Sequence, residues 1–454
     1  MTRSQETDSK RQETSFGGKE NDLSLSPNYI APMCVLLLAT FASVSASGQT
    51  SATGDQTPIE GSDETIIVVP RARQVGSKDL RGDDSQHASA ENGLGRAAFA
   101  TVVRVQESEG ERRTLGEVLA RTVGVSSQSL GGLGVFSSIS VRGADAGHTM
   151  VSVDGVPLSR IASVSANLGQ FDLSSFEAVE LYRGGVPPGL GGAGVGGALD
   201  MRTALGPGPD GKALQLSAGM GSYGSRHLRG RWLAGERAGA RAYHLAASYE
   251  RANGDFEFFD DRGTALNLGD DETSTRLNNG YDRLGLLARA RLGRWTLGSR
   301  STIQEQGLPG SSHNQAESSA LHTVHELVDA RYARPSILAG KGSLELRSFA
   351  SVERQRYSDP ENEIGLLAQD SVYLTTSTGL GGGLGFDLGD EQHVLLDLNS
   401  RLDWFRETPM GQAGLAGARG GRQGLALAVA DHIGLANNSL FVDLGARVDG
   451  LRTR

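Results

Sequence analysis

Three histidines have the spacing that comes nearest to a metal site in this sequence. His313, His322 and His325 fall within one short stretch of the chain. No acidic cluster stands beside them at a spacing that zinc sites use, and the single cysteine, Cys34, lies far upstream. We therefore expect these histidines to lie in surface loops, and the sequence predicts no metal site.

A glycine-rich run at residues 191–197 is the nearest match to a phosphate-binding loop. It lacks the Lys-Ser/Thr ending and the following helix that such a loop needs to hold a phosphate. Glycine in this run is better suited to tight turns and close packing of the backbone. No nucleophile with a base stands at a defensible spacing elsewhere. The sequence therefore predicts no enzyme and no bound cofactor.

The composition favours sheets with one polar face. The 454 residues include 63 glycines, while hydrophobic residues make up 38% and aromatic residues 6%. This apolar content is low for a compact enzyme, and it fits either a disordered chain or strands that are polar on one face. The net charge of -9, without clustered Lys and Arg, disfavours nucleic acid as a partner. One cysteine excludes a disulfide framework.

Residues 1–48 are predicted to be a signal-peptide region. An apolar run at residues 35–44 follows a polar stretch with basic residues and precedes the small residues 45–48. That order is typical of a secretory signal, and the run is too short to cross a bilayer as a helix. The basic residues lie far upstream, so a start at Met33 stays open. The alternative, a buried core helix, has no helical neighbour to pack on.

Residues 49–98 are predicted to be a disordered linker that contains one short strand. The linker is rich in Gly, Ser, Asp and Gln, but residues 64–70 form a β-branched run that ends at a proline. A strand without a partner in its own domain is suited to adding to the sheet edge of another protein. The alternative is a linker with a chance apolar run. The pairing residues would be Glu64, Thr65, Ile66, Ile67, Val68 and Val69.

Residues 99–203 are predicted to form a compact domain of mixed α and β structure. Thr114 and Glu117 have the spacing of a capping box at the start of a short helix, which Gly124 ends. Asp154-Gly155 supplies a tight turn between strands. Strands are expected at residues 100–105, 139–142, 149–153 and 178–183.

Six blocks of this domain follow one another in a recognisable order, at residues 115–119, 124–125, 139–143, 153–158, 179–184 and 194–199. In this order and spacing the domain resembles the plug domain of TonB-dependent outer-membrane receptors. The chain departs from the family's pattern at Val123, Gly185 and Asp200, which are single positions in loops or at strand ends. The plug-motif positions that the resemblance implies are Arg142, Gly143, Asp154, Gly155, Glu180, Arg183, Gly184, Gly196 and Gly197.

The resemblance also implies a protein partner and a set of ion pairs. Residues 64–70 look like the family's TonB box, which pairs with TonB, and TonB is driven by ExbB and ExbD. Arg142, Glu180 and Arg183 would then be plug positions that pair with charges on a barrel wall.

Residues 211–454 alternate between apolar and charged side chains, as strands must when one face meets lipid and the other meets water. In one stretch Leu284, Leu286 and Ala288 oppose Arg283 and Arg289. We count about eleven such stretches, against ~22 strands in a plugged receptor barrel. Long polar segments at 253–280 and 307–321 are expected to be outer loops. The chain ends without a terminal aromatic, which predicts a truncated receptor or a gene fragment.

The sequence thus predicts an antiparallel transmembrane β-barrel, incomplete and about half of a 22-stranded one, with an N-terminal mixed α/β plug. The expected function is import of a scarce ligand, such as a ferric siderophore, cobalamin or a glycan, across the outer membrane of a Gram-negative bacterium. Outer-membrane lipid would surround the barrel. Residues 159–167 are the first place where we expect ligand contacts.

Three alternatives stay open at this point. A signalling receptor of the same family would need a further folded domain before the box, and about seventeen residues between Gly48 and the box are too few for one. A secreted Gly-rich β-protein acting on polysaccharide would also alternate in its strands. A truncated, non-functional receptor fragment is the third.

Overall fold

The computed structural model describes residues 100–104, 114–129, 136–158, 166–183, 186–187, 189–190, 194–205, 211–236, 240–264, 266–365, 367–389, 391–410, 416–435 and 440–453. The predicted signal-peptide region, the TonB box, Gly184 and most of the segment 159–167 lie outside the described residues. The chain divides into Met1–Ser62 and Asp63–Arg454, and every described residue belongs to the second unit. Across the described ranges, no helix has both the length and the apolar character needed to cross a membrane.

The N-terminal described domain is a small five-stranded sheet with a helix and a hairpin beside it. The strand order is β1-β6-β7-β4-β5, in which β4 and β7 are parallel and the other pairs are antiparallel. A second sheet pairs β2 with β3. The elements are β1 (Ala100–Arg104), α3 (Leu115–Ala120), β2 (Val125–Ser129), β3 (Ser137–Val141), η2 (Ala146–His148), β4 (Thr149–Val153), β5 (Val156–Pro157), η3 (Leu168–Gln170), η4 (Leu173–Ser175), β6 (Phe176–Tyr182) and β7 (Gly197–Thr203).

Local sequence signals account for the boundaries in this domain. At the start of α3 the Thr114 side chain accepts a hydrogen bond from the Glu117 backbone, while the Glu117 side chain accepts one from the Thr114 N–H, which confirms the capping box. The turn after β4 places Asp154 at φ 52° and Gly155 at φ 83°, a left-handed geometry that these two residue types tolerate. Apolar side chains of the strands, such as Val141, Leu181 and Leu199, form the buried core.

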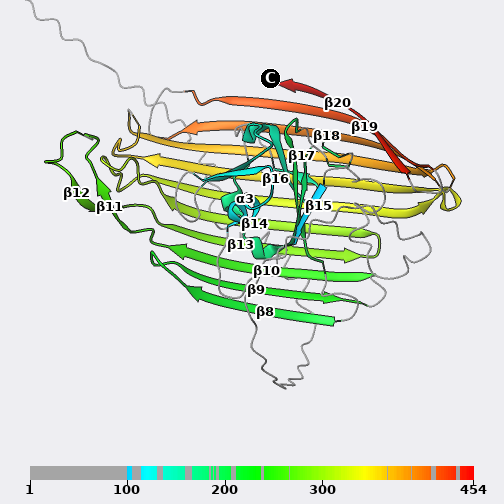
Figure 1. Cartoon of the computed structure of the whole chain (residues 1–454), viewed down its shortest axis with the longest axis horizontal. Helices are drawn as coiled ribbons and strands as arrows, with labels where there is room; N and C mark the ends of the chain where they lie inside the picture. Colours follow the sequence, from blue (N-terminus) through cyan, green and yellow to red (C-terminus); the bar gives the residue numbers. More distant parts are fainter. Residues whose placement is uncertain are drawn as a thin grey trace, which may run out of the picture. The chain divides into compact units, whose positions relative to one another are not determined.

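The C-terminal part forms one antiparallel sheet of eleven strands, in the order of the chain from β8 to β20 (Figure 1). The predicted number of strands is thereby confirmed. The strands are β8 (Gly211–Met220), β9 (Arg226–Gly235), β10 (Arg241–Ala252), β13 (Tyr281–Leu292), β14 (Trp295–Gly307), β15 (Ala320–Ile337), β16 (Gly342–Asp359), β17 (Gln369–Asp387), β18 (Gln392–Pro409), β19 (Arg419–Leu435) and β20 (Leu440–Thr453). We call this sheet the wall.

Connections between the wall strands alternate in length. At one end the strands are joined by short links, such as the two residues between β13 and β14. At the other end lie the longer segments, including 253–280 with the two-stranded hairpin β11 (Glu257–Asp260) and β12 (Glu272–Thr275), and 308–319. This is the arrangement expected from the predicted long loops.

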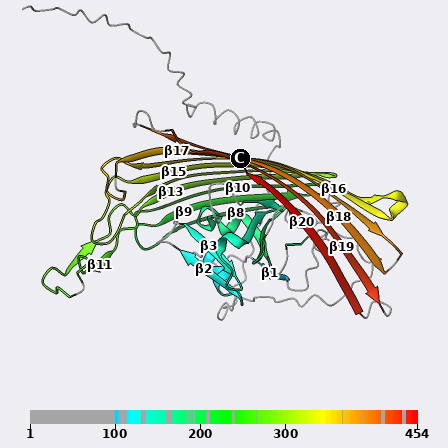
Figure 2. The same ribbon diagram turned by 90° about the horizontal axis from the view of Figure 1, so that it is seen from above.

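The two faces of the wall differ as the alternation predicted. Leucines on one face are exposed, with 38% of Leu284, 47% of Leu346 and 51% of Leu398 accessible. Arginines on the other face, such as Arg283 and Arg289, are buried because the N-terminal domain lies against them. The wall curves around that domain (Figure 2).

The histidine prediction is wrong for two of the three residues. His322 and His325 lie within strand β15, and only 2% of His325 is exposed. The reason is that both residues are paired in the sheet, since β15 lies between β14 and β16 along this stretch. Within the described ranges no group of three or more His, Cys, Asp or Glu side chains is arranged to hold a metal ion.

Candidate functional site

The contact surface between the small domain and the wall is built largely by arginines. Period-2 alternation in the wall strands sends these arginines to the face that the small domain covers. Each of them meets a group on the small domain. The arginines are Arg229 on β9, Arg283 and Arg289 on β13, Arg300 on β14, Arg347 on β16, Arg401 on β18 and Arg447 on β20.

Four of these arginines donate to backbone carbonyls of the small domain. Arg283 donates to the Gly169 carbonyl and Arg347 to the Gly189 carbonyl. Nη1 of Arg401 lies 3.4 Å from the Pro157 oxygen, and Nη1 of Arg447 lies 2.9 Å from the Leu190 oxygen. A carbonyl acceptor is present whatever the side chain, so these contacts depend on the backbone path rather than on residue type.

Two further arginines form ion pairs with carboxylates of the small domain. Arg289 pairs with Asp154, and 9% and 7% of the two side chains are exposed. The other Asp154 oxygen accepts the Thr203 N–H at 2.9 Å, so the carboxylate joins the turn after β4 to the end of β7 as well as to the wall. Arg229 Nε lies 3.3 Å from Asp172. Charges buried in this way must be paired, because an isolated one would be costly.

Arg300 contacts two aromatic rings instead of a carboxylate. Its guanidinium carbon lies 4.7 Å from the ring centre of Phe176 and 5.9 Å from that of Phe171. Its Nη2 also lies 3.2 Å from the Thr203 hydroxyl. A guanidinium over an aromatic face is attracted by the negative face of the ring, and the attraction is greatest when water is excluded.

Carboxylates of the wall itself hold several of the arginines in place. Glu250 on β10 lies between Arg229, at 2.7 Å, and Arg283. Asp403 on β18 accepts Arg401 at 2.7 Å. Because the wall fixes these guanidinium groups, they are already oriented toward the small domain.

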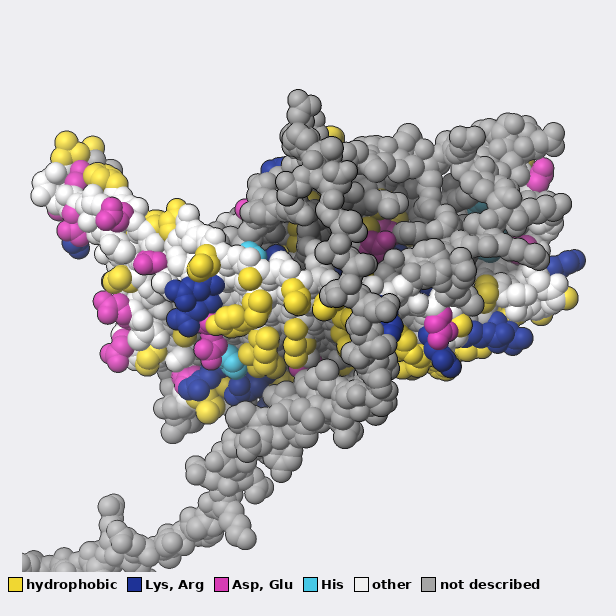
Figure 3. Space-filling view, turned by 90° about the horizontal axis from the view of Figure 1, so that it is seen from below, with side chains coloured by type: hydrophobic (Ala, Val, Ile, Leu, Met, Phe, Trp, Pro, Cys, Tyr) yellow, Lys and Arg dark blue, Asp and Glu magenta, His cyan; other side chains and the backbone are white. Residues whose placement is uncertain are grey.

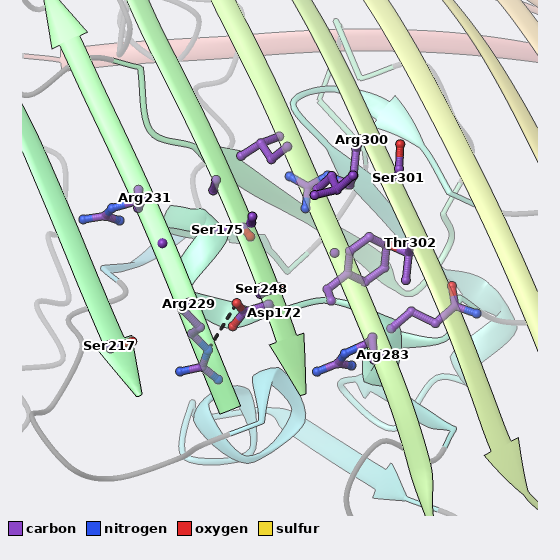
Figure 4. A pocket seen from close by; sticks show the side chains of 18 of the residues that line it. Asp172, Ser175, Ser217, Arg229, Arg231, Ser248, Arg283, Arg300, Ser301 and Thr302 are labelled. Atoms are coloured by element: carbon purple, nitrogen blue, oxygen red, sulfur yellow. Dashed lines mark ion pairs between the residues drawn. The ribbon is translucent and has the colours of Figure 1, made fainter. Parts of the chain in front are cut away.

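A cavity of about 30 Å³ remains between the two parts (Figure 4). Asp172 and Ser175 of the small domain face Arg229, Arg283 and Arg300 of the wall across it. This volume holds about one or two water molecules. At this position the interface leaves no channel for a solute of ligand size.

The comparisons with known proteins agree with this architecture. The family model of the TonB-dependent Receptor Plug Domain matches residues 97–198. Residues 97–198 are the plug domain of a TonB-dependent receptor. The receptor's N-terminal domain is therefore the plug, and the wall matches about half of a receptor barrel.

Individual relatives support the same assignment. The vitamin B12 transporter BtuB of Photobacterium profundum is 32% identical over 134 residues, which are 30% of this chain and 22% of that protein. The pyoverdine outer membrane receptor FpvA from Pseudomonas aeruginosa PAO1 superposes with a TM-score of 0.60 at 15% identity, over 78% of this chain and 57% of that one.

The copper transporter OprC also has a TM-score of 0.60, at 10% identity over 78% of this chain and 54% of that one. The chain thus spans little more than half the length of these two solved receptors. Likeness at this level of identity shows the fold, and receptors of this family reside in the outer membrane of Gram-negative bacteria.

Two of the plug-motif charges that were expected to pair with a barrel wall, Glu180 and Arg183, have described contacts within the plug. Glu180 on β6 accepts the Tyr182 hydroxyl at 2.6 Å and Arg202 at 3.2 Å, both within the plug. Burial, together with the neighbouring Glu180 carboxylate, raises the pKa of Tyr182, so the phenol stays protonated and donates. The partner of Glu180 is thus on the adjacent strand β7, and not on the wall.

Arg183 also finds its partners inside the plug. It donates to the Val123 carbonyl at 2.9 Å and to the Thr101 hydroxyl at 2.7 Å. Burial and the nearby Arg142 lower the pKa of Arg183. Arg142 itself is exposed at φ 54°, next to Gly143 at φ 74°. The described contacts of Glu180 and Arg183 lie inside the plug, and their pairing with a barrel wall stays a prediction.

The two remaining motif glycines are required by close backbone approach. Gly197 has φ 140°, and a Cβ there would lie 2.5 Å from the Tyr182 oxygen. A Cβ on Gly196 would lie 2.5 Å from that of Ala144. These distances are far too short for any other residue, so the glycine run brings β7 against its neighbours.

Sequence reasoning missed Asp172 and the wall arginines as interface residues, and it noted Asp200 merely as a departure. Asp200 is fully buried, with the Ser152 hydroxyl at 2.6 Å, the Gly155 N–H at 2.9 Å and Arg202 at 2.8 Å. Burial raises the pKa of this carboxyl. The signal that could have found the arginines was their regular place on the polar face of each wall strand.

Proposed function

We propose that this receptor imports a scarce ligand across the outer membrane and that TonB, driven by ExbB and ExbD, supplies the energy. The observation that carries the proposal is the contact of the plug with the described wall, where the cavity between Asp172 and Arg229 is about 30 Å³. In the proposal, a ligand passes this contact when part of the plug moves. Because the outer membrane has no ATP, the force must come from a partner protein.

Residues 64–70 are the proposed point of attachment for that partner. An extended segment that adds to a sheet edge bonds through its backbone, and Ile66, Ile67, Val68 and Val69 have the β-branched side chains that favour this geometry. The pull would reach the plug through the linker that follows the box.

The wall contacts suit a plug that must move and return. Hydrogen bonds from arginine to backbone carbonyls, as at Pro157 and Leu190, can be exchanged for water at a modest net cost. Apolar contact between the wall and the plug is given by Leu327 on β15, which is buried in the plug's core cluster, and by Phe349 on β16, which packs against that cluster. Ligand passage therefore requires the rearrangement of arginine contacts together with the apolar contact at Leu327 and Phe349.

The proposed ligand classes are a ferric siderophore, cobalamin or a glycan. The relatives, a vitamin B12 transporter, a pyoverdine receptor and a copper transporter, support a metal chelate or a metal-containing cofactor most directly.

Binding of the purified periplasmic domain of TonB to the full-length chain tests the proposal. We expect Ile67→Pro to weaken this binding at least about tenfold, because proline removes a backbone donor and cannot continue a pairing strand. Ser85→Pro, which places a proline in the same linker outside the box, is the matched control and should bind as the unchanged chain does. Equal affinity of all three chains would exclude residues 64–70 as the attachment point.

A further inference from the structure

The loop between β10 and β13 carries a hairpin that extends beyond the wall (Figure 2). Its strands pair Glu257 with Thr275 and Phe259 with Thr273. By the period of two, these four residues share one face of the ribbon, and all four are exposed. Within the described residues, nothing covers this face.

Large apolar side chains stand on the hairpin in full contact with water. Phe259 is 68% exposed, Leu268 is 79% exposed and Leu266 at the tip is 99% exposed. Figure 3 shows apolar side chains together with acidic ones on this projecting segment. Apolar groups gathered at one exposed site, and rimmed by polar residues, mark an interaction surface.

The charge of the hairpin is strongly negative. Residues 253–280 contain seven acidic and two basic side chains. Both bases are engaged, since Arg262 pairs with Glu272 and Arg276 donates to the carbonyls of Gly310 and Ser311. The acidic side chains beside the apolar ones therefore give this surface a net negative charge.

Contacts with the neighbouring loop hold the base of the hairpin in one position. The Leu277 N–H donates to the Gln315 side chain at 2.8 Å, and Gln315 donates back to the Thr275 carbonyl at 3.0 Å. Asn278 donates to the Ser319 carbonyl at 2.7 Å. The Tyr223 ring packs edge-on against Phe256, with the ring centres 5.8 Å apart. Because the hairpin is already held in one position, it loses little conformational entropy when it binds a partner.

We propose that this hairpin surface, formed by Asp255, Glu257, Phe259, Leu266, Leu268 and Asp271, is a docking site for a cationic amphipathic polypeptide. The acidic rim selects basic side chains, and the exposed Phe and Leu residues select apolar ones. The four-residue strand β11 spans ~13 Å and the tip lies beyond it, a length that suits an extended polypeptide better than a compact chelate. This inference does not rest on the proposed function.

The test uses the full chain in zwitterionic lipid nanodiscs and a fluorescent peptide of alternating lysine and leucine as the probe. Fluorescence anisotropy gives its Kd, after subtraction of binding to empty nanodiscs. We expect Phe259→Ser to weaken binding about tenfold, since an exposed aromatic anchor is lost without a change in the fold. The double variant Asp255→Asn/Glu257→Gln should also weaken binding and should reduce its dependence on salt.

A matched control carries the same kinds of change at the opposite end of the wall. Leu388 is 59% exposed in the turn between β17 and β18, near Glu391. The variant Leu388→Ser/Glu391→Gln should bind the probe as the unchanged chain does. The proposal is overturned if the hairpin variants bind as tightly as this control, or if a glutamate–leucine peptide binds as tightly as the lysine–leucine probe.

Discussion

At the scale of single residues, the contact of Asp154 with Arg289 is the most specific link between plug and wall. Asp154 lies in a left-handed turn, φ 52°, that few residue types tolerate, and its two oxygens meet Thr203 and Arg289. One side chain thus fixes a turn, a strand end and a wall strand together.

Replacing Asp154 with asparagine isolates the charge of this contact. Asparagine tolerates the same backbone geometry and keeps an oxygen for the Thr203 N–H, but the buried Arg289 loses the negative charge of Asp154. We expect the free energy of local plug opening to fall by about 1–3 kcal/mol, measured by hydrogen exchange of amides in β4 and β7. Glu177→Gln, at an exposed position of β6, should change it little. Equal protection in both variants would mean that the ion pair does not seat the plug.

At the scale of elements, a carboxylate ties two of the long loops together. Glu363, in the loop after β16, accepts the N–H groups of Glu317 at 2.8 Å and Ser318 at 2.9 Å in the loop before β15. These hydrogen bonds lower the pKa of Glu363 to about 2 from an ordinary value of 4.5. The cause is that each N–H donor stabilises the ionised carboxylate relative to its protonated form.

This tie should hold at neutral pH and fail only in strong acid. Because the folded pKa lies below the ordinary value, the tie contributes its full stability above pH 4.5 and loses it as the pH falls toward 2. Glu363→Gln should speed exchange of the amides of Glu317 and Ser318 about tenfold at pH 7, after correction for intrinsic rates. Glu361→Gln, at an exposed neighbour, is the control. A tie that weakens already near pH 6 would contradict this account.

Local signals predicted individual elements well. The expected strand at residues 149–153 is β4 (Thr149–Val153), and the capping box at Thr114 starts α3 as its spacing indicated. Such features depend on neighbours within a few residues. The alternation of the wall strands likewise predicted which residues share a face.

Pairing between distant elements could not be predicted in the same way. Arg289 meets Asp154 because of the register of β13 and the position of the plug against that strand. Neither the register nor the position can be predicted from the residues next to Arg289 or Asp154. Glu180 was expected to pair with the wall, but its place on β6 beside β7 brings Arg202 closer. His325 was read as a loop residue because its local sequence does not reveal how far β15 extends.

At the scale of the whole molecule, the account makes the plug a movable stopper. Arginines on six strands of the wall contact the plug. The cavity between the plug and the wall holds one or two water molecules. The linker before the plug carries residues 64–70, a segment suited to strand addition. Under the proposed function, import depends on opening this interface from the periplasmic side.

The most direct test is the accessibility of Ser175, a buried plug residue that lines the cavity at the wall. Ser175→Cys, combined with Cys34→Ser so that one thiol is present, would be labelled with a maleimide reagent in cells that produce the receptor. We predict labelling in energised cells with TonB, and little labelling in cells without TonB or after deletion of residues 64–70. Equal labelling in all three cases would contradict a plug that TonB opens through this segment.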